Sequence, residues 1–69
     1  MTTEAFKSEL LPKKDKLFRL AVFLLKNREE AEDTVQEIFL KLWNMKESLA
    51  KYNNLEAVMM TMTRNRCLD

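Results

Sequence analysis

The sequence predicts an all-α fold. Glycine is absent and proline occurs once in 69 residues, whereas the tight turns of small β-sheet folds usually need glycine. Leu, Met, Glu, Lys and Ala are abundant, and all five are strong helix formers. Apolar residues also recur at the three- and four-residue spacing of a helix face. We therefore expect one domain over residues 1–69, a compact bundle of three to four helices with a small core.

Two helical segments are predicted before residue 28. Pro12 has no N–H to donate and disfavours helical geometry at the residue before it, so a short helix over 3–10 should precede a longer one from Pro12 or Lys13. We expect the longer helix to be central and covered on more than one side, with Asn27 as its C-terminal stop. Its apolar residues are Leu17, Leu20, Ala21, Leu24 and Leu25, with Phe18, Val22 and Phe23 beside them.

The next helix is predicted from Glu29 to Asn44 or Met45. Its expected buried stripe is Ala31, Val35, Ile38, Leu42 and Met45. Residues 29–37 contain five acidic side chains and no basic one, although the whole chain has a net charge of +1. This acidic block is either a surface for a basic partner or a solvated helix start that complements the helix dipole. Phe39, Leu40 and Trp43 lie outside the stripe and either form a patch for a protein partner or complete the core.

A polar connector with one helical turn around Glu47 to Ala50 is predicted over residues 46–54, followed by a last helix from Leu55 to the end. Asn53 or Asn54 is the expected N-cap. The inward side chains of this helix should be Leu55, Val58, Met59, Met62 and either Cys67 or Leu68. No capping residue follows, so we expect the 69 residues to be the N-terminal fragment of a longer protein.

No enzymatic, metal or cofactor site is predicted. Histidine is absent, one cysteine cannot form an internal disulfide, and no glycine-rich phosphate loop is present. Cys67 has Arg64 and Arg66 nearby, so it is either a thiol of lowered pKa or, as we prefer, a buried structural one. No apolar run approaches the ~20 residues of a membrane span, and no signal peptide is evident. A lone cysteine also suits the cytoplasm, which is the expected location.

Residues of the connector and last helix suit nucleic-acid binding. Tyr52 can stack on an unpaired base, amides can read base edges, and cations can contact phosphates. These side chains are expected to lie near one another on one surface. The alternative is an ordinary capped helix with a few surface charges. The candidate residues are Lys51, Tyr52, Asn53, Asn54, Arg64 and Asn65, with Arg66 as a further cation.

Two motifs carry a resemblance to a known family. The stretch from Leu17 to Trp43, centred on Glu30-Ala-Glu-Asp-Thr-Val-Gln-Glu-Ile-Phe39, resembles the second region of bacterial RNA polymerase sigma factors of the extracytoplasmic-function type. The chain's end, which contains Arg64-Asn-Arg-Cys-Leu-Asp69, resembles the helix that follows in that family. Together the motifs cover nearly the whole chain.

The resemblance implies a transcription initiation domain that is not an enzyme. In such a domain, Asp33, Gln36, Glu37 and Leu40 would dock on the clamp helices of the polymerase's largest subunit. The connector and last helix would recognise and melt the −10 promoter element, holding a flipped base of the non-template strand. An anti-sigma factor is a further expected partner. The domain that reads the −35 element is absent from these residues.

Three positions depart from the family pattern. Val58 lacks an expected aromatic side chain, Thr61 lacks an expected basic one, and Thr34 replaces an aliphatic residue. These departures affect the DNA-contacting helix more than the docking face. They leave open an alternative function, a sigma-like interaction module that acts as a decoy or regulator without reading DNA.

Overall fold

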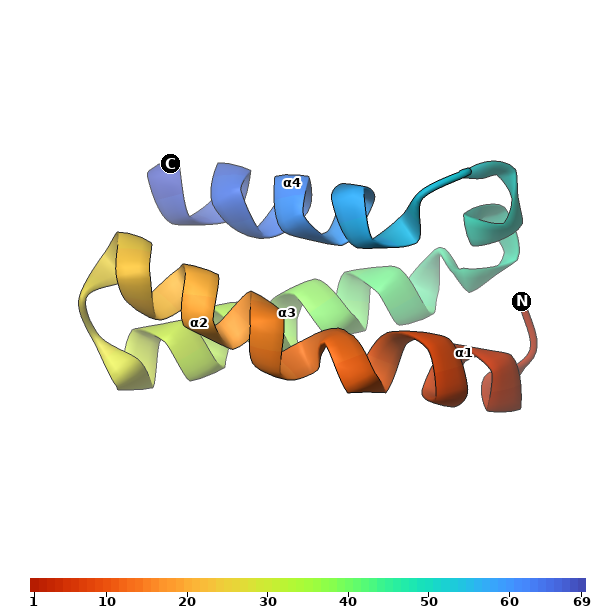
Figure 1. Cartoon of the computed structure of the whole chain (residues 1–69), viewed down its shortest axis with the longest axis horizontal. Helices are drawn as coiled ribbons and strands as arrows, with labels where there is room; N and C mark the ends of the chain where they lie inside the picture. The colour runs from red at the N-terminus through yellow and green to blue at the C-terminus, as the bar shows by residue number, and fades with distance from the viewer.

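The computed structural model describes all 69 residues and confirms the all-α prediction. The α-helices are α1 (Thr3–Leu10), α2 (Lys14–Leu25), α3 (Arg28–Asn44) and α4 (Leu55–Leu68), with 3-10 turns at Leu11–Lys13 (η1) and Lys46–Lys51 (η2). Figure 1 shows α1 and α2 following one another along one side, with α3 returning past both and α4 lying beside α2. The helices α2, α3 and α4 pack against one another in pairs. No helix is both long and apolar enough to cross a lipid bilayer.

Three of the four α-helices, α1, α3 and α4, have a side-chain cap at their N-terminus. Thr2, Asn27 and Asn54 each accept a hydrogen bond from a backbone N–H in the first turn, at 3.1, 2.9 and 3.0 Å respectively. Each cap satisfies a donor that the helix itself leaves without a partner. The prediction for Asn54 is confirmed, whereas the prediction for Asn27 is wrong. Asn27 is extended and caps α3, and α2 ends at Lys26, which adopts the left-handed conformation with φ 56°.

The core lies where the bundle helices meet. In α3 the expected stripe is buried except for Met45, which is half-buried. The turn predicted around Glu47 to Ala50 is present as η2, and its Leu49 is fully buried, so this connector also contributes to the core. The ten buried apolar residues are Phe6, Leu10, Leu17, Ala21, Ala31, Val35, Ile38, Leu42, Leu49 and Met59.

One prediction of burial is wrong. Phe23 on α2 is 73% exposed, because it lies away from the side of α2 that carries the buried Leu17 and Ala21. Of the two alternatives predicted at the end of α4, Cys67 is partly buried and Leu68 is exposed. The last helix instead buries Thr63, whose hydroxyl donates to the carbonyl oxygen of Met59 at 2.8 Å. That bond removes the penalty of burying a polar group.

Helix α1 packs an aromatic side chain against α3. The ring of Phe6 lies edge-on to Trp43, with centroids 5.2 Å apart, and to Phe39 at 6.4 Å. Phe39 is therefore half-buried and part of the core's edge, while Trp43 remains partly exposed with Lys46 over its ring. Leu40 is 60% exposed and has no such cover. Phe39 therefore contributes to the core, as one of the two alternatives predicted, whereas Leu40 is free of such packing.

Candidate functional site

The outer face of α3 gathers three of the four predicted docking residues. Asp33, Gln36 and Leu40 are separated by three and four residues, so they lie on successive turns of one helix face. All three are exposed, and they lie opposite the stripe that contains Ala31 and Ile38. The face therefore offers a carboxylate, an amide and an apolar side chain in a row, a combination that suits a partner with both basic and apolar groups.

Glu37 is placed differently from these three. It lies at the edge of α3 that borders α4, where its carboxylate accepts a hydrogen bond from the Nε of Arg66. Both side chains are a little under half exposed. This hydrogen bond and the charge of Glu37 raise the pKa of the Arg66 guanidinium above its usual value. Glu37 is thus already paired within the domain, which sequence reasoning did not anticipate.

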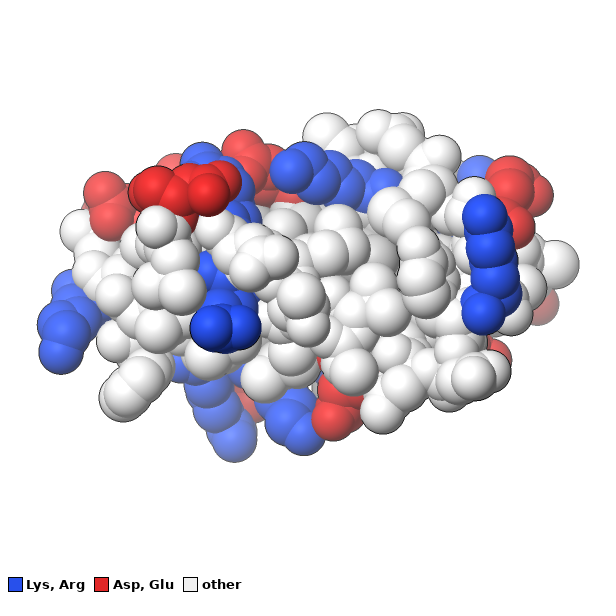
Figure 2. Space-filling view, turned by 90° about the horizontal axis from the view of Figure 1, so that it is seen from above, with Lys and Arg blue, Asp and Glu red and all other residues white.

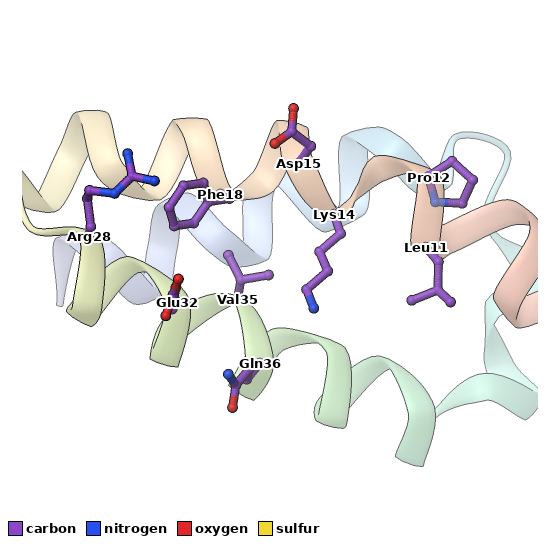
Figure 3. Close-up of a pocket in the computed structure, with 9 residues that line it drawn as sticks. All are labelled: Leu11, Pro12, Lys14, Asp15, Phe18, Arg28, Glu32, Val35 and Gln36. Carbon is purple, nitrogen blue, oxygen red and sulfur yellow. The ribbon is translucent and has the colours of Figure 1, made fainter.

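A groove of about 530 Å³ runs between α2 and α3, beside Gln36. Figure 3 shows Phe18 and Val35 in its middle, with Lys14 and Gln36 extending from opposite helices. The guanidinium of Arg28 lies over the Phe18 ring, 5.2 Å from its centroid. Basic and acidic side chains both line the groove, so it has no single charge. Its lining is Leu11, Pro12, Lys14, Asp15, Phe18, Arg28, Glu32, Val35 and Gln36.

The predicted DNA-binding residues fall into two groups at opposite ends of α4. The connector group precedes the helix, whereas Arg64 and Asn65 lie near its end. Arg64 follows Asn54 by ten residues, or about 15 Å of helix, so the two groups do not form one pocket. All six predicted side chains are exposed. The Oδ1 atom of Asn54 is occupied by the cap, which leaves only its NH₂ group for another partner.

A second groove, of about 480 Å³, lies beside the connector. Tyr52, Asn53 and Asn54 line it together with Pro12 and Lys13 from the η1 turn, and with Ser8, Glu9, Leu55 and Glu56. Sequence reasoning missed Lys13 because its proximity to Tyr52 depends on how η1 packs. The groove contains an exposed phenol, amides and a cation, which are the groups that hold an unpaired nucleotide, together with the carboxylates of Glu9 and Glu56.

Charged side chains surround an uncharged area on the face that contains α4. Figure 2 shows acidic side chains at the upper left with basic ones beside them, basic ones along the lower left, both signs at the right margin, and a largely uncharged middle. Ala57 and Thr61 are exposed on α4 between the two groups of predicted DNA residues. Between α2 and α4, Lys16 Nζ donates to Glu56 at 2.8 Å, and this bond and charge hold the pKa of Glu56 below its usual value.

Cys67 and the carboxylates have no arrangement suited to catalysis or metal binding. Burial raises the pKa of the Cys67 thiol, and the charge of Arg66 only opposes that shift. Such a thiol has little of the nucleophilic thiolate at neutral pH. A groove between α3 and the end of α4 contains Glu30, Asp33 and Glu37, but no three potential ligands converge on one point where they could hold an ion.

The fold is a small helical domain with an exposed face on α3 and a groove beside the connector that precedes α4. Residues 13–69 match the family model described as Sigma-70 region 2, and the chain belongs to this family. It is a sigma factor domain that acts in transcription initiation, and RNA polymerase and promoter DNA are its partners. The family is not a family of enzymes. No curated protein and no solved structure matches the chain.

Proposed function

We propose that this domain docks on the clamp helices of the polymerase's largest subunit and holds the melted −10 element of the promoter. The observation that carries the docking proposal is the uncovered row of Asp33, Gln36 and Leu40 on α3. Asp33 and Gln36 would accept hydrogen bonds from basic side chains of the coiled coil. Leu40, at the exposed centre of the face, would supply the apolar contact. Glu37 would contribute from the edge of the same helix.

The DNA part of the proposal rests on the groove beside the connector. A non-template base that leaves the stack costs a few kcal/mol, which contacts with the protein must offset. Stacking on an aromatic side chain contributes about 1–3 kcal/mol per base. Tyr52 and Asn53 would receive such a base. Lys13, which lines the groove, and Lys51, which precedes Tyr52 in the chain, would balance phosphate charge. Arg64 and Asn65 would meet the strand farther along α4.

The docking proposal is tested by the binding of a clamp-helix fragment to the domain. Replacing Gln36 and Leu40 together by alanine removes two central contacts, and we expect binding to weaken at least ~30-fold, since contacts of this kind carry about 2 kcal/mol or more. Glu47→Ala is a matched control, because Glu47 is a highly exposed residue of η2, away from this face. Equal binding by wild-type and doubly substituted domains, with unchanged helicity, would show that the partner uses another face.

A second function remains a candidate because the middle of the α4 surface is uncharged. Val58 and Thr61 provide no aromatic or basic group there, as expected of an interaction module that does not read DNA. Promoter single-strand binding separates the two functions. A DNA-reading domain binds with an affinity that falls steeply as salt rises. A decoy would bind the clamp helices alone.

Finer assignments follow from the motif over residues 30–39. We infer that the domain is of the extracytoplasmic-function type and forms part of a longer cytoplasmic factor, whose other domain reads the −35 element. An anti-sigma factor would control it by covering the α3 face. Competition between such a protein and the clamp helices for the wild-type domain, with both interactions weakened by Leu40→Ala, is the expected result.

A further inference from the structure

Phe23 is the most exposed large apolar residue of the domain. Its side chain is 73% exposed, whereas Leu17 and Ala21 on the same helix are buried. The Phe23 ring is therefore not part of the hydrophobic core. It also lies on α2, whereas the proposed docking face is on α3. An aromatic side chain left in water by the fold is a candidate contact for a partner.

The packing of α2 against α4 gives Phe23 its position. Lys16 reaches Glu56, so the side of α2 that carries Lys16 borders α4. Phe23 follows Lys16 by seven residues, or about two turns, and so lies on the same side of α2. Figure 1 shows α2 and α4 running side by side toward the same end of the molecule. Arg64 follows Glu56 by eight residues on α4, so it lies at the same end of the seam between α2 and α4 as Phe23.

Cations accompany Phe23 along the exposed side of α2. Arg19 is highly exposed and forms an ion pair with Asp15, with 2.7 Å between nitrogen and oxygen. Lys26 forms none of the domain's ion pairs. Lys16 is exposed as well, although it is paired with Glu56. A basic edge with one exposed aromatic ring is complementary to a phosphate backbone with unstacked bases.

We propose that the edge of α2 formed by Lys16, Arg19, Phe23 and Lys26 is a second contact for unpaired DNA. Phe23 stacks on a base, and the cations contact the flanking phosphates. The inference rests on the proposed function, because a strand held at Tyr52 and Arg64 follows the seam that this edge borders. Phe23 supplies a stacking surface that the exposed middle of α4, with Ala57 and Thr61, does not have.

The test measures binding of the 69-residue chain to a fluorescent single-stranded DNA of mixed sequence, roughly 12 nucleotides long. Anisotropy titrations at several salt concentrations compare wild type with Phe23→Ala, Phe23→Trp and Lys26→Gln. We expect Phe23→Ala to weaken binding at least about fivefold, and Phe23→Trp to retain it. Lys26→Gln should reduce the slope of log affinity against log salt by about 0.7. Leu11→Ala is the matched control, since Leu11 is an exposed apolar residue at the α2–α3 groove.

Tyr52→Ala in the same assay separates this inference from the proposed function. If Tyr52→Ala weakens binding and Phe23→Ala does not, the connector binds DNA and the α2 edge does not, which overturns the inference alone. If only Phe23→Ala weakens binding, the inference stands and the connector's proposed role fails. No binding by the wild-type chain at low salt overturns both. Light scattering measures whether the chain self-associates. If Phe23→Ala abolishes self-association and leaves DNA binding unchanged, the edge is a contact between two copies, which overturns the inference.

Discussion

Helix α1 lies outside the residues that match the family, yet it contributes two fully or nearly fully buried side chains to the core. We therefore predict that Phe6→Ala strongly destabilises the domain. Phe6 is 6% exposed and packs edge-on against Trp43 and Phe39. Truncation of a buried phenylalanine costs about 3–5 kcal/mol, which includes the cavity that it leaves. Each edge-on aromatic pair accounts for roughly 0.5–1.5 kcal/mol beyond the buried area.

The size of the domain makes this loss decisive. At about 0.05–0.15 kcal/mol per residue, a 69-residue domain has a free energy of unfolding of roughly 3–10 kcal/mol. The loss in Phe6→Ala is of the same order. With an m-value of about 1 kcal/mol/M, the urea midpoint should fall by about 3 M, or the variant should be unfolded in buffer.

The assay is urea unfolding followed by circular dichroism and by the fluorescence of Trp43, the only tryptophan. Because Phe6 touches the Trp43 ring, the folded-state fluorescence should also change. Phe23→Ala is a control of the same residue type at an exposed position, and its stability should stay within about 0.5 kcal/mol of wild type. Coincident unfolding curves for Phe6→Ala and wild type would refute the reasoning and make α1 an appendage that the domain does not need.

Three further predictions concern the polar groups. Arg66→Gln should strengthen docking on the clamp helices a few-fold at most in a direct binding assay, because it frees Glu37 from an exposed ion pair and such pairs are weak. Weaker docking would mean that Arg66 itself contacts the partner. Because the pKa of Glu56 is lowered by folding, its ionised carboxylate stabilises the domain; this contribution is complete above the pKa of the unfolded state and is lost as pH falls through the folded-state pKa. Glu56→Gln should therefore make the free energy of unfolding fall less steeply at acid pH. A fall as steep as that of wild type would contradict this. The raised pKa of Cys67 predicts slow reaction with a thiol reagent at neutral pH in the native chain and fast reaction in urea, and equal rates in both would show that burial does not protect it.

Helix existence followed from local properties of the sequence. The break at Pro12, the cap at Asn54 and the buried stripe of α3 all depend on residues close to one another in the chain, and the structure confirms them. The error at Asn27 has a local cause too. One residue suited both the end of α2 and the start of α3, and the side-chain bond to Glu30 selected the second role.

Side-chain burial was predicted less well because it depends on neighbours that are remote in sequence. The apolar spacing of α2 predicted a helix covered on more than one side, and α3 and α4 both pack against it, yet Phe23 on the remaining side stays exposed to water. Thr63 was not predicted to be buried, since its polar hydroxyl is satisfied only by the carbonyl of Met59 within the folded helix. Periodicity gives the direction of a side chain, whereas tertiary packing decides whether anything lies there.

The candidate surfaces show the same division. The row of Asp33, Gln36 and Leu40 was predictable, because one helix places them on one face whatever the rest of the chain does. Their roles, like those of the predicted DNA-binding residues, stay predictions. The pairing of Glu37 with Arg66 joins residues 29 positions apart, and the contact between Lys16 and Glu56 joins residues 40 apart. Local periodicity therefore determined the helices, their caps and the family's motifs. Only the packing of α2, α3 and α4 decided which charged side chains form ion pairs and which exposed surfaces of these helices lie next to one another.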